Sequence, residues 1–346
     1  MDMIEATKWG EMNDGREVTL FTLSGSDGFQ VKITNYGGII TSILAPDKDK
    51  KPGEVTLGYD EFESYTDETP YFGCITGRCC NRIGKGEFTL NGKTYKLATN
   101  NGNNHLHGGV KGFDKVLWDA VVEGDKLAMK YLSPDGEEGY PGNLQATVTY
   151  SIENGTGVKI EYHAVTDADT PVNLTNHTYF NLAGSGNVLN HKMEIPASRI
   201  TFADDESIPN GDILSVEGTP MDFRTATPIG QRIGDDYNLL HWARGYDCNW
   251  NIDKELGEYG LAATLTDPVS GRIMEVLTTQ PGLLFYSGNY LDETVASRDG
   301  GKLAKHSGLC LETEHYPNSP NIPAFPSVVL KPGQEYNQTT LYRFSC

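Results

Sequence analysis

The sequence is short of basic residues, of long apolar runs and of regular helical patterns. Its 346 residues include 28 Lys and Arg against 47 Asp and Glu, which gives a formal net charge of −19 at pH 7. Nucleic acids and anionic membranes bind basic surfaces, so neither is expected as a partner. No run of about 18 apolar residues occurs, so no transmembrane helix is predicted. The acidic balance favours a neutral small-molecule ligand over a phosphorylated or carboxylated one.

Cysteines at the spacing of a metal site or a dense disulfide framework are also missing. The six cysteines lie at positions 74, 79, 80, 248, 310 and 346, with no C-x₂-C spacing. This usage is typical of reduced thiols in a cytoplasmic protein rather than of a secreted disulfide framework. The first 15 residues lack a basic segment followed by an apolar one, so no signal peptide is predicted. A cytoplasmic location is therefore expected, with the periplasm or secretion left open if a signal has been removed.

What the sequence does have is alternation with a period of two. Residues 18–23 and 31–33 alternate as half-buried strands do. Asn91-Gly92 predicts a two-residue hairpin turn, and Asn154-Gly155 predicts a second hairpin of the same design. Turn residues at 267–271 predict a third hairpin. Only residues 235–242 suggest a turn or two of helix. With no repeat or linker in view, we expect a single all-β domain over residues 1–346, a large antiparallel β-sandwich.

Five polar segments interrupt these strand patterns and could carry chemistry. An Arg fork and amides can hold sugar hydroxyls, a His among amides can have its tautomer fixed, and aromatic rings can stack on a sugar ring. On a strand, Glu312 and Glu314 would share a face, so that each carboxylate feels the other. The segments are residues 77–83, 100–109, 171–182, 245–249 with 278–286, and 311–321.

His105 and His107 could form a metal pair if they lie on a strand, because alternate residues of a strand share a face. Neither an H-E-x-x-H motif nor a cysteine pair supplies the further ligands. We therefore expect no metal, and a hydrogen-bonding role for His107.

Together the five segments resemble the galactose mutarotase (aldose 1-epimerase) family. The resemblance runs from about Gly37 to the C-terminus, and the segments follow the family's order. It rests on five motifs: Asn81-Arg-Ile, Leu106-His-Gly-Gly, Asn173-Leu-Thr-Asn-His-Thr-Tyr-Phe-Asn-Leu, Gln280-Pro-Gly and Leu311-Glu-Thr. The resemblance implies a β-supersandwich fold and an isomerase that interconverts the α and β anomers of free aldohexoses, such as galactose or glucose, without a cofactor.

The resemblance also implies roles for individual residues. Glu312 would be the catalytic base and His177 the catalytic acid. The sugar pocket would be lined by Asn81, Arg82, His107, Asp247 and Gln280. Three positions depart from common family patterns: Asn103 replaces a frequent proline, Cys79-Cys80 replace small or apolar residues, and Glu314 stands where glutamine is common.

Three alternatives remain open from the sequence. A β-sandwich glycoside hydrolase or lyase could use Glu312 with Asp247 as its two carboxylates. A non-catalytic carbohydrate-binding protein could have the same pocket. A hexose-6-phosphate mutarotase would need additional Arg or Lys for the phosphate, which the acidic balance disfavours. A monomer or a homodimer is expected.

Overall fold

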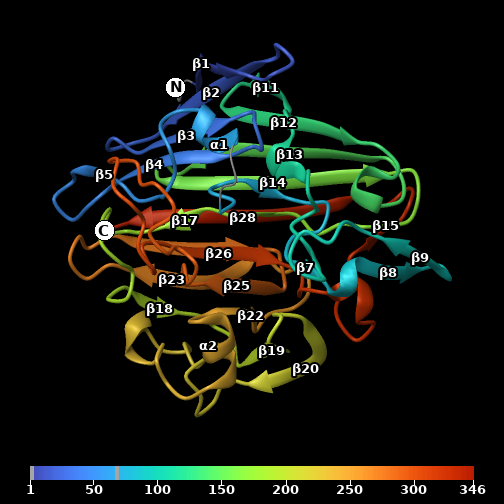
Figure 1. Ribbon diagram of the computed structural model, residues 1–346. Helices are drawn as coiled ribbons and strands as arrows, with labels where there is room; N and C mark the ends of the chain where they lie inside the picture. Colours follow the sequence, from blue (N-terminus) through green and yellow to red (C-terminus); the bar gives the residue numbers. More distant parts are fainter. Residues whose placement is uncertain (1–3, 67–69) are drawn as a thin grey trace.

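The computed structural model describes residues 4–66 and 70–346. Three large antiparallel sheets build the protein (Figure 1). The first contains, in spatial order, β1 (Ile4–Glu11), β2 (Glu17–Ser24), β3 (Gln30–Thr34), β4 (Ile40–Pro46) and β5 (Pro52–Glu54).

The largest sheet has nine strands, which run from β11 near the top of Figure 1 towards β18 near the bottom. Their order is β11 (Asp119–Glu123), β12 (Lys126–Ser133), β13 (Leu144–Glu153), β14 (Gly157–Thr166), β28 (Tyr336–Ser345), β24 (Ile273–Thr278), β23 (Gly260–Thr266), β18 (Lys192–Glu194) and β21 (Thr227–Pro228).

A six-stranded sheet packs against the nine-stranded one. Its order is β17 (Tyr179–Phe180), β26 (Leu309–Glu314), β25 (Gly282–Tyr286), β22 (Asp247–Asn251), β19 (Arg199–Ala203) and β20 (Pro209–Ser215). Tyr342 of β28 donates a hydrogen bond to the Leu311 carbonyl of β26 at 3.1 Å, and its ring lies 4.9 Å from that of Phe180. The core between these two sheets is therefore apolar and closely packed.

Short pieces complete the fold. Four two-stranded ladders join β6 (Ile75–Thr76) to β16 (Thr175–Asn176), β7 (Arg82–Ile83) to β10 (His105–Leu106), β8 (Glu87–Leu90) to β9 (Lys93–Lys96), and β15 (Thr170–Pro171) to β27 (Val329–Leu330). The helical pieces are α1 (Glu63–Thr66), α2 (Asn238–Ala243), η1 (Gly84–Gly86), η2 (Phe113–Lys115), η3 (Glu137–Gly139), η4 (Ile229–Gln231) and η5 (Ser319–Asn321). No helix within residues 4–66 and 70–346 is long and apolar enough to cross a membrane.

These strands confirm the predicted all-β sandwich. The Asn91-Gly92 turn joins β8 to β9, and both of its residues have the positive φ that a type I′ turn requires. The third predicted hairpin is β23–β24, and α2 overlaps the segment 235–242 where a helical turn was expected and ends one residue beyond it.

The second hairpin, β13–β14, differs from its prediction by one residue. Glu153 pairs with Gly157, so the loop contains Thr156 as well as Asn154 and Gly155. Thr156 is held by β28, because its carbonyl accepts a hydrogen bond from the Phe344 amide at 3.0 Å and its hydroxyl donates to the Phe344 carbonyl at 2.8 Å. These bonds to a distant strand lengthen the turn, and the local turn residues could not reveal them.

Candidate active site

The floor of the site is formed by β22, β25 and β26. Successive side chains of a strand point to opposite faces, so Glu312 faces away from the core that Leu311 enters. Strand register places Leu284 opposite Glu312, and Tyr286 opposite Asp247. The pairing of three consecutive strands in the sheet thus brings two carboxyl groups, far apart in the sequence, to the same polar face.

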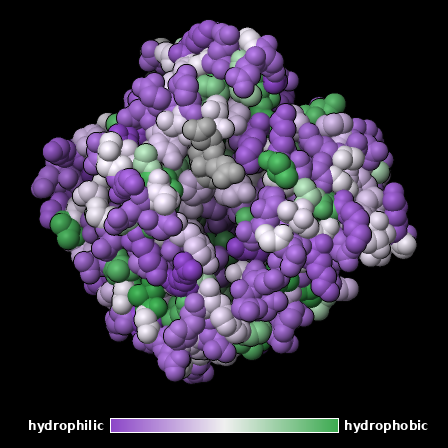
Figure 2. All heavy atoms as spheres, viewed as in Figure 1, coloured by the Kyte–Doolittle hydropathy of each residue, from purple (hydrophilic) through white to green (hydrophobic). Residues whose placement is uncertain are grey.

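A cavity of about 500 Å³ lies over this floor. Figure 2 shows the hollow near the centre of the viewed face, with hydrophilic residues around it. Its lining combines carboxyl, imidazole, amide, guanidinium and aromatic groups, which suits a polar ligand with apolar ring faces. The described lining residues are Pro70, Tyr71, Asn81, Arg82, Asn101, Gly102, Asn104, Leu106, His107, His177, Tyr179, Asp205, Glu206, Ser207, Asp247, Leu284, Tyr286, Tyr290 and Glu312.

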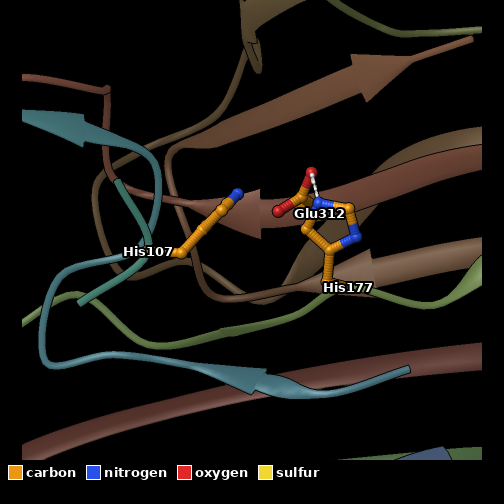
Figure 3. Close-up of side chains that lie close together, drawn as sticks. All are labelled: His107, His177 and Glu312. Atoms are coloured by element: carbon orange, nitrogen blue, oxygen red, sulfur yellow. Dashed lines mark ion pairs between the residues drawn. The ribbon is translucent and has the colours of Figure 1, made fainter. Parts of the chain in front are cut away.

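Glu312 and His177 face each other in this cavity (Figure 3). His177 Nε2 lies 3.5 Å from Glu312 Oε1, and the Glu312 side chain is only 1% exposed. Neither carboxylate oxygen of Glu312 has a hydrogen-bond partner within the protein. A buried carboxyl group without partners is costly unless a ligand supplies the missing donors, so Glu312 is prepared to accept hydrogen bonds from ligand hydroxyls.

His107 comes from the turn that follows β10. The ladder between β7 and β10 brings it beside Asn81, whose backbone N–H donates to His107 Nδ1 at 3.1 Å. The neutral imidazole therefore carries its proton on Nε2 and can donate it. The ring centres of His107 and His177 lie 5.0 Å apart, so both imidazoles reach the same part of the cavity.

Arg82 is the one cationic residue among the described lining residues. Its Nε donates to Asn101 Oδ1 at 3.1 Å, and its Nη1 lies 3.9 Å from Asp247 Oδ2. The acidic side chains of the lining are Asp205, Glu206, Asp247 and Glu312. With acids outnumbering the single guanidinium, the cavity favours neutral ligands over anionic ones.

The structure brings six of the seven predicted site residues together in one cavity: Asn81, Arg82, His107, His177, Asp247 and Glu312. Gln280 is not among the described lining residues. Its amide donates to the Tyr336 hydroxyl at 3.0 Å and its carbonyl oxygen lies 2.7 Å from His315 Nδ1, so both ends of the side chain are engaged behind the lining.

Sequence reasoning missed the acidic loop between β19 and β20 and two tyrosines of the rim, Tyr71 and Tyr290. Glu206 of that loop accepts a hydrogen bond from Asn104 Nδ2 at 3.1 Å, which ties two walls of the cavity together. Tyr290 stands near Tyr286, with ring centres 6.3 Å apart. An acidic turn and tyrosines at or near the surface are common in proteins, so their sequence carries no signal that would single them out.

Burial dominates the electrostatics of the site. It raises the pKa of Glu312 well above the ordinary carboxyl value, with further upward contributions from Glu314 and Asp247 and an opposing one from Arg82. Burial lowers the pKa of His177 to about 4 and that of His107 well below the ordinary value. In the absence of a ligand, both imidazoles are therefore neutral at pH 7.

His107, His177 and Glu312 lie close enough together to be considered as a metal site. One possible ligand atom from each lies within 4.8 Å of the others. A metal ligand must offer a lone pair, but the hydrogen bond from Asn81 to His107 Nδ1 leaves a proton on Nε2. The trio therefore fits hydrogen bonding to a ligand better than it fits a metal ion.

Comparison with known proteins places this site in a family. The family described as aldose 1-epimerase matches residues 19–343. Galactose mutarotase from Bos taurus is 46% identical over 92% of both chains, and aldose 1-epimerase from Escherichia coli K12 is 38% identical over 96% of both. The crystal structure of an aldose epimerase homologue from C. elegans, 27% identical, superposes with a TM-score of 0.87 over 94% of this chain and 98% of that one. The chain belongs to the aldose 1-epimerase family.

Proposed function

We propose that the protein interconverts the α and β anomers of a free aldohexose such as galactose or glucose, with Glu312 as general base and His177 as general acid. The observation that carries these roles is the facing pair in the cavity, a carboxyl group without hydrogen-bond partners 3.5 Å from an imidazole. Two such groups that line the same cavity can exchange protons with two neighbouring oxygens of one sugar. The relatives in the comparison are an aldose 1-epimerase and a galactose mutarotase, which supports this substrate class.

The chemistry requires one proton to leave and one to arrive. Glu312 takes the proton of the C1 hydroxyl, the C1–O5 bond breaks as the C1 carbonyl forms, and His177 delivers a proton to O5. Rotation about the C1–C2 bond presents the other carbonyl face, and reversal of the two transfers closes the ring as the other anomer. No atom is gained or lost and no oxidation state changes.

Only one proton has to be shared between Glu312 and His177 for this cycle. The shifted pKa values place it on the carboxyl group in the empty pocket, which leaves the imidazole neutral. The reactive form, carboxylate with imidazolium, has the same number of protons. A sugar that donates its C1 hydroxyl to Glu312 stabilises the carboxylate, and the ring oxygen beside His177 stabilises the imidazolium, so substrate binding favours the reactive form.

The other lining residues would hold the sugar in place. Arg82, which is anchored by Asn101, and His107, which donates from Nε2, suit the ring oxygen and neighbouring hydroxyls. Asp247 and Asn81 supply acceptors and orientation. Contact between the sugar and Gln280 stays a prediction, and it would require the Gln280 amide to leave Tyr336 or His315.

Polarimetry of freshly dissolved α-D-galactose and α-D-glucose tests the function. We expect the approach to anomeric equilibrium to accelerate in proportion to the protein added, in weak buffer at neutral pH. An unchanged rate with every free aldose would contradict the proposal. Cleavage of aryl glycosides would then indicate a hydrolase, and sugar binding without turnover would indicate a binding protein.

Further expectations concern the protein as a whole. We propose that residues 1–346 form one domain that acts as a monomer or homodimer in the cytoplasm, binding neither nucleic acid nor membrane. The largest hydrophobic cluster joins Ile33, Tyr162 and Phe285 from the three large sheets, which supports a single domain. All six cysteines are free, which suits a reducing compartment.

The pH profile of kcat/KM should be broad, because the catalytic pair keeps its single proton over a wide range. A second proton binds only near pH 4, where His177 titrates in the free enzyme, so activity should fall below about that pH. The alkaline limb should lie well above the usual carboxyl pKa, since that of Glu312 is raised. Initial rates by polarimetry from pH 3.5 to 10, corrected for the uncatalysed reaction, would check this. An acid limb near pH 6.5 would contradict a buried, neutral His177.

Arg82→Ala should raise KM and lower kcat, together costing about 10²-fold or more in kcat/KM. The change removes the guanidinium whose Nη1 lies 3.9 Å from Asp247 Oδ2, and with it the positive charge that opposes the effect of burial on that carboxyl group. Steady-state kinetics would measure both constants. Arg343→Ala, which breaks the surface pair with Glu275 at 2.8 Å, is the matched control and should retain activity. Unchanged KM and kcat in Arg82→Ala would remove this residue from the site.

A further inference from the structure

A second carboxyl group, that of Glu314, lies beneath the catalytic one. Glu314 is two residues from Glu312 on β26, so both side chains lie on the same face of the strand. Glu314 is fully buried and does not line the cavity. It therefore cannot meet the sugar, and a buried carboxyl group with no contact to a ligand requires another explanation.

Glu314 accepts two hydrogen bonds from the segment that precedes β7. Asn81 Nδ2 donates to Oε1 at 3.0 Å, and the Cys80 thiol donates to Oε2 at 2.9 Å. Burial raises the pKa of Glu314 to about 8, and these two donors oppose the rise, so Glu314 becomes ionised on the alkaline side of neutrality. Glu312 has no such donors. When the two carboxyl groups hold one proton between them, the negative charge is therefore better placed on Glu314 and the proton on Glu312.

The charges near Glu314 are mostly negative. Glu312 shares its strand, Asp247 of β22 adds a further negative charge, and Arg82 from β7 supplies the opposing positive charge. Cys79 and Cys80 precede β7, and burial raises the pKa of both thiols, so both stay neutral. His177, beside Glu312, is neutral as well. The adjoining β25 places Gly282 opposite Glu314, which brings no charge. Arg82 lies near Asp247, so its single positive charge is shared among the carboxyl groups of Asp247, Glu312 and Glu314.

We propose that Glu314 is a positioning residue that acts through Glu312: once ionised, it presents a buried negative charge, held by Asn81 and Cys80, that makes Glu312 a stronger base towards the C1 hydroxyl. The inference rests on the proposed function. A like charge nearby favours the protonated form of a carboxyl group and so raises its pKa. A general base works best when its pKa is near the operating pH.

The same carboxylate also organises the sugar-binding residues. Asn81, which Glu314 holds through Nδ2, donates its backbone N–H to His107 and accepts the Arg82 N–H on its side-chain oxygen at 2.8 Å. Removal of the Glu314 side chain would therefore disturb structure as well as charge. A test must separate these two roles.

Glu314→Gln separates them, because glutamine keeps an oxygen for Asn81 and removes the charge. We expect the alkaline limb of the kcat profile to move down by about one pH unit, and kcat above about pH 8, where Glu314 is ionised, to fall about three- to ten-fold. Glu314→Asp keeps the charge but shortens the side chain, so it should leave the limb near that of the unmodified protein even if kcat falls. Glu5→Gln, with the same charge change on exposed β1, should change neither.

The measurement is the kcat–pH profile by polarimetry, with thermal melting of each variant to confirm folding. If Glu314→Gln does not fold, Glu314→Met provides the same loss of charge at similar length. A limb that stays in place in a folded neutral variant would overturn the inference and leave Glu314 a purely structural role. If the unmodified protein is inactive on every aldose, the proposed function itself fails, so the two failures are distinguishable.

Discussion

Glu312→Gln is expected to lose about 10²–10⁴-fold in kcat while the protein stays folded. Glutamine matches glutamate in shape but cannot take the proton of the C1 hydroxyl. Both carboxylate oxygens of Glu312 lack partners in the protein, so the substitution breaks no internal hydrogen bond. Polarimetry would measure the loss, and KM should change much less than kcat because the amide can still contact the sugar hydroxyls.

The stability of Glu312→Gln provides an independent check. Because folding raises the pKa of Glu312, the folded state holds this proton more tightly than the unfolded chain does. Its stabilising effect is complete below the unfolded pKa and is lost as the pH rises through the folded pKa. Glutamine does not titrate. The melting temperature of the variant minus that of the unmodified protein should therefore be at least as large at pH 8 as at pH 4. A folded Glu312→Gln with full activity would contradict the assignment of the base.

The hairpins and alternating strands could be predicted because their signals are local. Asn91-Gly92 fixes a turn by its own backbone preferences, and the pattern of β13 and β14 repeats every two residues. Strands β25 and β26 are different, because every residue of both is buried. One face of each strand packs in the core, and the other face lies beneath the cavity. A strand buried on both faces loses the alternation of exposure from which sequence reasoning starts.

The site residues could be named because motif and chemistry agree, but the direction of each side chain could not. Gln280 belongs to a segment that reaches the floor of the cavity, yet its amide turns to Tyr336 and His315. The neighbouring carboxyl groups show the opposite outcome. Their spacing on a strand predicted that Glu312 and Glu314 interact, and the structure confirms that they share a face. Burial raises the pKa of Glu312, and the neighbouring Glu314 adds to that rise. A period of two carries that information, whereas a hydrogen bond to a distant strand does not.

His177→Asn is expected to lower kcat about 10²–10⁴-fold with a smaller change in KM. Asparagine can occupy the same place and donate a hydrogen bond to O5, but it cannot release a proton to the leaving ring oxygen. His177 Nε2 lies 3.5 Å from Glu312 Oε1 and Nδ1 lies 3.6 Å from Cys310 Sγ, so the substitution breaks no short hydrogen bond between these side chains. Steady-state polarimetry on galactose and glucose would give both constants.

The matched control is His241→Asn, on exposed α2, which removes a histidine that pairs with Asp236 at 3.0 Å and should leave kinetics unchanged. The acid limb distinguishes a proton donor from a group that only orients the sugar. If His177 is the donor, the residual activity of His177→Asn should lose the limb near pH 4, because no imidazole remains to take the second proton. A variant with a raised KM but an unchanged kcat and acid limb would show that His177 only binds the sugar. The proton for O5 would then have to come from His107, the other imidazole in the cavity.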